Sequence, residues 1–63
     1  MCESTVFLSE GGRTTEVMSG VTRIVMRGED AVLTNIVGEQ VTLSGVVLTE
    51  ANLLSHGIVF KKR

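Results

Sequence analysis

Seven glycines punctuate the 63-residue chain at short intervals, and the chain contains no proline. Val, Thr and Ile, which favour strands, are abundant between the glycines. Short strands at regular spacing with turn signals between them are typical of a small sandwich or barrel. Six or seven such strands in so short a chain cannot make two large sheets. The glycine spacing therefore predicts one small, strongly bent sheet that closes on itself.

The expected strands follow directly from the turn positions. They cover residues 4–9, 14–19, 21–27, 31–37, 40–44 and 46–48, followed by a hairpin with arms 53–54 and 58–60 around the turn 55–57. Residues 49–52 have a weak helical pattern, with Thr49 as the cap of at most one turn. The predicted fold is all-β: an SH3-like or Sm-like barrel of six to seven short antiparallel strands in a single domain, residues 1–63. An OB-fold fits less well, because it normally needs more chain and a helix.

The size of the chain predicts self-association. A domain of about 60 residues buries only about 60% of the surface that its unfolded chain exposes, so its stability is marginal. The only cysteine leaves no intrachain disulfide, while 43% of the residues are hydrophobic. Apolar surface that a small monomer cannot hide marks an interface. We therefore expect a homodimer, with twofold symmetry as the default.

Charge and targeting signals narrow the functional classes. Six basic and seven acidic residues give a net charge of −1, which provides no electrostatic attraction to nucleic acid. The first 20 residues lack a basic start followed by a long apolar run, so no secretory signal is expected. Apolar runs are too short to span a membrane. The chain is expected to be cytoplasmic, where a cysteine stays reduced.

The main candidate for chemistry is Cys2, one residue from the chain's amino end. Its sulfur, the terminal amine of Met1 and the intervening amide nitrogen are close enough along the chain to form a chelate. A soft thiolate beside nitrogen donors suits a late first-row metal better than Mg²⁺ or Ca²⁺. The lone histidine, His56, and the carboxylate of Glu3 are further candidate ligands. The alternative to metal binding is that Cys2 has no functional role and is a cysteine that is buried or present by chance.

An enzyme would need a different arrangement of the same residues. Cys2 would have to be activated by His56, with a third orienting group such as Asn35 or Asn52. Such a site also needs a pocket, and the interior of so small a barrel is filled by side chains. We therefore expect a protein that is not an enzyme and has no catalytic residues.

The chain also resembles a known family in several segments. They are Met1-Cys2 leading into Val6-Phe7-Leu8, a glycine turn near residue 11, Gly28-Glu29-Asp30-Ala31-Val32-Leu33, Asn35-Ile36-Val37-Gly38-Glu39, and Asn52-Leu53-Leu54 before His56-Gly57-Ile58-Val59-Phe60. The set, in this order and at this length, resembles the CooT family of small nickel-binding proteins, which are accessory to carbon monoxide dehydrogenase maturation. The resemblance implies a homodimer of small β-barrels that binds Ni²⁺ through Cys2. It also implies delivery or storage of nickel for a client enzyme.

Together these observations give one hypothesis and one rival. The hypothesis is that two symmetry-related Cys2 thiolates share one Ni²⁺, with amine or amide nitrogens completing the site. The rival is an Sm-like module that binds RNA or protein and has no metal role. Arg13, Arg23 and Arg27 could form a basic stripe for it, but Phe7 and Phe60 are the only aromatic residues. They offer little platform for stacking bases.

Overall fold

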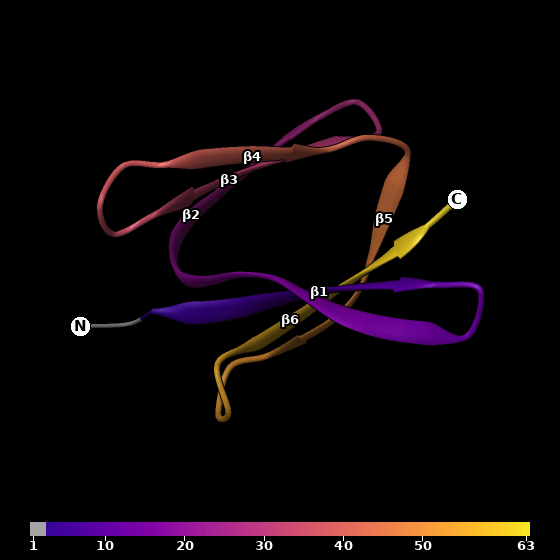
Figure 1. The fold of residues 1–63 in the computed structure, drawn as a ribbon, viewed down its shortest axis with the longest axis horizontal. Helices are drawn as coiled ribbons and strands as arrows, with labels where there is room; N and C mark the ends of the chain where they lie inside the picture. The colour runs from indigo at the N-terminus through magenta and orange to yellow at the C-terminus, as the bar shows by residue number, and fades with distance from the viewer. Residues whose placement is uncertain (1–2) are drawn as a thin grey trace.

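Six strands make up most of the computed structural model, which describes residues 3–63 (Figure 1). They are β1 (Ser4–Glu10), β2 (Arg13–Arg27), β3 (Asp30–Asn35), β4 (Gln40–Leu43), β5 (Val46–Asn52) and β6 (Gly57–Lys62). The predicted all-β class is confirmed. The expected strands 4–9, 31–37 and 40–44 are reproduced as β1, β3 and β4, with ends that differ by one or two residues.

Two predicted strands are one in the structure. The segments 14–19 and 21–27 form the single long strand β2, which continues through Gly20. Gly20 has φ +65, and the pairing of β1 with β2 shifts by one residue here, between Ser4↔Val21 and Val6↔Met18. An extra residue in one strand is a β-bulge, and glycine at positive φ is its usual occupant. The glycine bends the strand instead of ending it.

The chain after residue 48 also differs from expectation. Residues 49–52 belong to β5 and not to a helical turn, because Glu50 and Ala51 pair with β6, and an isolated helical turn has no comparable partner. The expected hairpin arm 53–54 is part of the turn between β5 and β6. Lys61 and Lys62 extend β6 beyond the expected arm 58–60 and lie opposite Val47 and Val46.

The strand order across the sheet is β4-β3-β2-β1-β6-β5. Four of the five pairings are antiparallel, as predicted, but β1 and β6 pair in parallel, with Val6 opposite Ile58. This parallel pair corrects the expectation of a wholly antiparallel sheet. Its cause is the long path of the chain, which passes through β2 to β5 before β6 returns beside β1 in the same direction.

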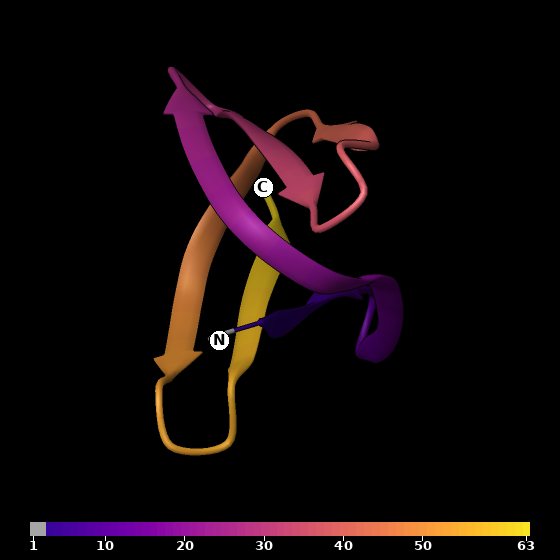
Figure 2. The same cartoon turned by 90° about the vertical axis from the view of Figure 1, so that its left-hand side faces the viewer.

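The sheet is strongly bent around one core (Figure 2). In a flat sheet, β3 and β5 would be about 19 Å apart, four strand spacings. Instead, the N–H of Val46 in β5 donates to the carbonyl of Glu29, just before β3, at 2.9 Å. The buried hydrophobic residues therefore come from five strands: Val6, Val21, Ala31, Leu33, Val46, Ile58 and Phe60. The predicted bent, barrel-like arrangement is thus present, with β4 and β5 as the outer strands of the sheet order.

Candidate functional site

The start of β1 lies against the turn between β5 and β6. The backbone N–H of Thr5 donates to the carbonyl of His56 at 2.9 Å, and Thr5 pairs with Gly57 in the parallel ladder. His56 has φ +60 and is exposed. The β1–β6 pairing therefore brings the only histidine beside the strand that leads from the amino end of the chain.

A second turn approaches the same place from the other side. The N–H of Ile36, in the turn after β3, donates to the carbonyl of Gly20 at 2.9 Å. The position that a Cβ would take on Gly20 is 3.8 Å from Cγ2 of Ile36 and 3.9 Å from Oε1 of Glu3. The side chain of Glu3 thus lies at the bend of β2. The first described residues lie between the β3–β4 turn and the β5–β6 turn.

Two asparagines shape these turns. Oδ1 of Asn35 accepts hydrogen bonds from the N–H groups of Val37 (3.1 Å) and Glu39 (2.9 Å), and its Nδ2 donates to Oε1 of Glu39 at 2.8 Å. Oδ1 of Asn52 accepts from the N–H groups of Leu54 (3.1 Å) and Ser55 (3.0 Å).

Such side-chain bonds to the following backbone are what asparagine contributes to turns. They engage the Oδ1 atoms of Asn35 and Asn52, the two residues considered above as the third member of a Cys–His catalytic pair. They also leave aliphatic side chains on the surface, and Leu54 is 92% exposed. Asparagine followed by two aliphatic residues marks both turns in the sequence, although the expected strand 31–37 and hairpin arm 53–54 covered these positions.

The predicted metal ligands fall in two groups. Met1 and Cys2 lie outside the described residues. Glu3 and His56 both lie close to the start of β1, but no ion pair joins them within residues 3–63. In the same range, no group of three or more His, Cys, Asp or Glu side chains could hold a metal ion.

An apolar groove opens from the core near this end. It has a volume of about 260 Å³ and lies between β2 and the β5–β6 pair, lined by Ile24, Met26, Leu48, Ala51, Ile58 and Phe60. No polar surface lines it. Met26 is 46% and Leu48 is 54% exposed, although both face the core side of the sheet. We call these six residues the apolar groove.

A second hollow continues the apolar groove toward the amino end. It is lined by Ser4, Val21, Thr22, Arg23, Ile24 and Ile58. Ile24 and Ile58 line both spaces. This hollow, whose lining is partly polar, reaches the first residue of β1, which is two residues from Cys2 in the sequence.

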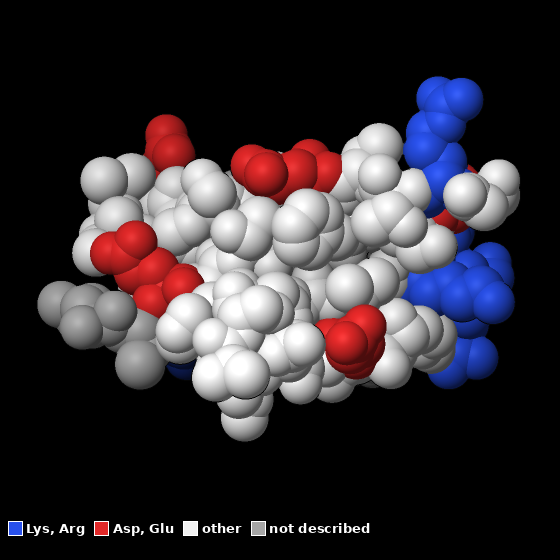
Figure 3. All heavy atoms as spheres, turned by 90° about the horizontal axis from the view of Figure 1, so that it is seen from below, with Lys and Arg blue, Asp and Glu red and all other residues white. Residues whose placement is uncertain are grey.

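The surface offers little for stacking bases. Phe60 is only 1% exposed and Phe7 is half-buried, and the sequence holds no other aromatic residue. Lys and Arg side chains gather at one end of the face in Figure 3, the end that carries the β1–β2 hairpin and the C terminus in Figure 1. Residues 3–63 contain no helix long and apolar enough to span a membrane.

Comparison with known proteins gives two matches of different kinds. The family model described as CO dehydrogenase accessory protein CooT matches residues 1–61. A crystal structure from Carboxydothermus hydrogenoformans, assigned to CooT, superposes with a TM-score of 0.87 over 98% of each chain, at 21% sequence identity. At that identity the likeness shows a shared fold. No curated protein sequence matches the chain.

Proposed function

Because the chain belongs to the CooT family of CO dehydrogenase accessory proteins, we propose that it carries or stores Ni²⁺ for maturation of a nickel enzyme such as carbon monoxide dehydrogenase. In this proposal the metal is bound through Cys2 where two copies of the chain meet. The role is binding and transfer, and the accessory character of the family agrees with a protein that is not itself catalytic.

The chemistry of the proposed site follows from its ligands. One cysteine per chain is a poor site alone, but a twofold axis brings equivalent residues together. Two Cys2 thiolates, with amine or backbone amide nitrogens from the same chain ends, make the mixed sulfur and nitrogen set that suits square-planar Ni²⁺. Glu3 and His56, which both lie close to the start of β1, are additional candidate donors.

The observation that supports this proposal most is the continuity of the apolar groove with the hollow at Ser4, through the shared Ile24 and Ile58. An apolar surface that starts at the core and is left open marks an interface. Two residues of extended chain span at most about 7 Å, so Cys2 lies within that reach of Ser4. A second copy seated on the groove would therefore bring both thiols to one interface.

Native mass spectrometry tests the stoichiometry that the proposal requires. The protein, loaded with Ni²⁺ and freed of excess metal, should give a dimer that holds one Ni²⁺. A Cys2→Ser chain should give a dimer without retained metal, because the interface remains while the thiolates are gone. One Ni²⁺ per chain, or a nickel-binding monomer, would contradict a shared ion.

A further inference from the structure

A second groove lies on the opposite face of the sheet from the core. Arg23, Val25 and Arg27 alternate along β2 with the core-facing Ile24 and Met26, as successive strand residues point to opposite faces. Val32 and Thr34 of β3 and Gln40 and Thr42 of β4 line the same space, which has a volume of about 250 Å³. We call it the β2–β4 groove.

The β2–β4 groove is rich in hydrogen-bond donors. Arg23 pairs across the sheet with Thr34, which pairs in turn with Gln40. Nε2 of Gln40 donates to Oγ1 of Thr34 at 3.3 Å, so the hydroxyl hydrogen of Thr34 remains free to donate. Two guanidinium groups and the hydroxyl of Thr42 add further donors. Such a set suits a ligand that brings acceptors, and the guanidinium groups favour carboxylate or phosphate oxygens.

The two arginines are not neutralised by the chain around them. The only ion pair within residues 3–63 joins Arg63 to Glu29. Asp30 lies opposite Arg27 in the register, but its Oδ1 accepts a hydrogen bond from the N–H of Gly45 at 3.3 Å. Neither arginine is thus held in an ion pair within residues 3–63, and both are exposed to a ligand in the groove.

The floor of the β2–β4 groove between the two arginines is apolar, and this limits which ligands fit the groove. Val25 pairs with Val32, and both lie midway between Arg23 and Arg27. The two arginines are four positions apart along the strand, which is about 13 Å. An extended peptide has the same repeat, so acidic residues at its first and fifth positions and an aliphatic residue at its third match this pattern. Single-stranded RNA fits less well, because bases need aromatic side chains to stack on.

We propose that the β2–β4 groove binds an extended acidic segment of a partner protein, with the pattern acidic–x–aliphatic–x–acidic. The site is separate from the apolar groove, because the two are lined by opposite faces of β2. It contains none of the candidate nickel ligands, because it lies on residues 23–42, although Arg23 also lines the hollow at Ser4.

Fluorescence anisotropy with the full chain tests this proposal. The probe is a labelled peptide with the core Glu-Thr-Val-Thr-Glu, compared with the same peptide carrying Gln for Glu and with a labelled oligouridine. The protein variants are the double change Arg23→Gln and Arg27→Gln, and the matched control Arg13→Gln, an exposed arginine of the β1–β2 hairpin outside the groove. All three substituted arginines are exposed, so circular dichroism is enough to verify that the variants fold.

The acidic peptide should bind the native protein and the Cys2→Ser variant equally. The double variant should weaken binding about tenfold, from the loss of two exposed charge pairs, while Arg13→Gln changes it less than twofold. Amide NMR shifts on adding the peptide should centre on Val25, Val32 and Thr34. The proposal is overturned by equal binding of the Gln peptide, by insensitivity to the double variant, or by oligouridine binding more tightly than the peptide through the same arginines.

Discussion

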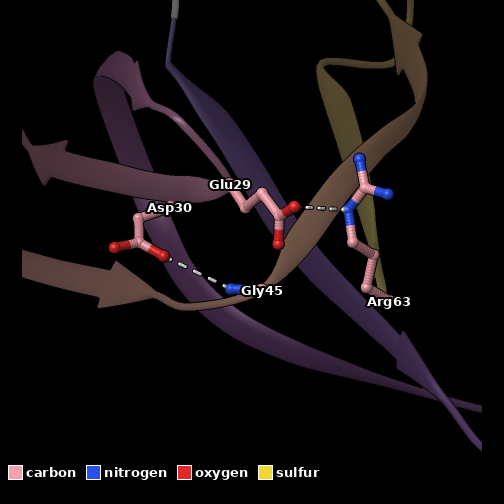
Figure 4. Close-up of polar contacts among 4 residues, drawn as sticks. All are labelled: Glu29, Asp30, Gly45 and Arg63. Atoms are coloured by element: carbon pink, nitrogen blue, oxygen red, sulfur yellow. Dashed lines mark hydrogen bonds and ion pairs between the residues drawn. The ribbon is translucent and has the colours of Figure 1, made fainter.

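The carboxylate of Asp30, the first residue of β3, accepts a hydrogen bond from the backbone N–H of Gly45, fifteen residues later, at 3.3 Å (Figure 4). Beside it, Val46 donates to the carbonyl of Glu29, and Arg63 donates to the carbonyl of Gly45. This corner joins the β2–β3 turn, the start of β5 and the chain's end. It holds the bend that keeps β5 opposite β2, with the apolar groove between them.

Replacing Asp30 by Ala should therefore destabilise the bent sheet. The variant leaves the partly buried N–H of Gly45 without its side-chain acceptor, and we expect the free energy of unfolding to fall by about 1 kcal/mol. Urea denaturation measures the change. The matched control is Glu29→Gln, which removes the 3.6 Å ion pair with Arg63 between two well-exposed side chains; it should cost less than about 0.5 kcal/mol. Equal losses for the two variants would show that the Asp30 bond has no special role.

The bend at Gly20 gives a second stability prediction. A Cβ there meets its nearest neighbours at 3.8 and 3.9 Å, which is ordinary contact distance, so the strain of a larger residue comes from the backbone. Gly20→Ala should lower the free energy of unfolding by about 1–2 kcal/mol, the cost of an L-residue in the left-handed region. Gly20→Asn should lower the free energy of unfolding by less than Gly20→Ala does, because asparagine tolerates this conformation. Thermal unfolding of the two variants tests the order; an Ala variant as stable as the native chain would refute it.

Much of the fold could be predicted from residue types. Glycine turns and β-branched runs located β1, β3 and β4. The prediction of two strands on either side of Gly20 was wrong, because a glycine at positive φ occurs both in turns and in bulges. The parallel partnership of β1 with β6 has no local signal, because it depends on where a distant strand returns.

The candidate site was only partly predictable for a related reason. His56 was singled out as the lone histidine, but its contact with Thr5 depends on the β1–β6 pairing. The apolar groove combines residues from β2, β5 and β6, which no single sequence segment shows. Met26 lines the groove and is 46% exposed.

The apolar groove provides a test of the proposed dimer. Leu48 lines it and is 54% exposed, so Leu48→Glu should leave the chain folded but place a charge where the second copy would sit. We expect the mass in analytical ultracentrifugation to fall to that of the monomer, with nickel affinity at least tenfold lower. Val37→Glu changes a more exposed aliphatic residue outside the groove and should remain dimeric. If Leu48→Glu remained dimeric and Val37→Glu became monomeric, the result would contradict an interface at the apolar groove and would indicate one at the β3–β4 turn.

The histidine can be separated from the thiol by substitution. The proposed square-planar site is completed by chain-end nitrogens, so His56→Gln should change the nickel affinity less than twofold. Its backbone contact with Thr5 does not involve the ring and should persist. Competition with a chelating dye measures the affinity. A loss as large as that of a thiol variant would instead place the imidazole among the ligands.

Calorimetric titration of Ni²⁺ into the native chain and into Cys2→Ser tests the central claim most directly. If Cys2 carries the metal, the native protein binds Ni²⁺ with release of protons, because a thiol must ionise to bind, and saturates at one ion per two chains. The Cys2→Ser protein should lose at least a hundredfold in affinity. Unchanged affinity and an unchanged proton count in Cys2→Ser would contradict the account.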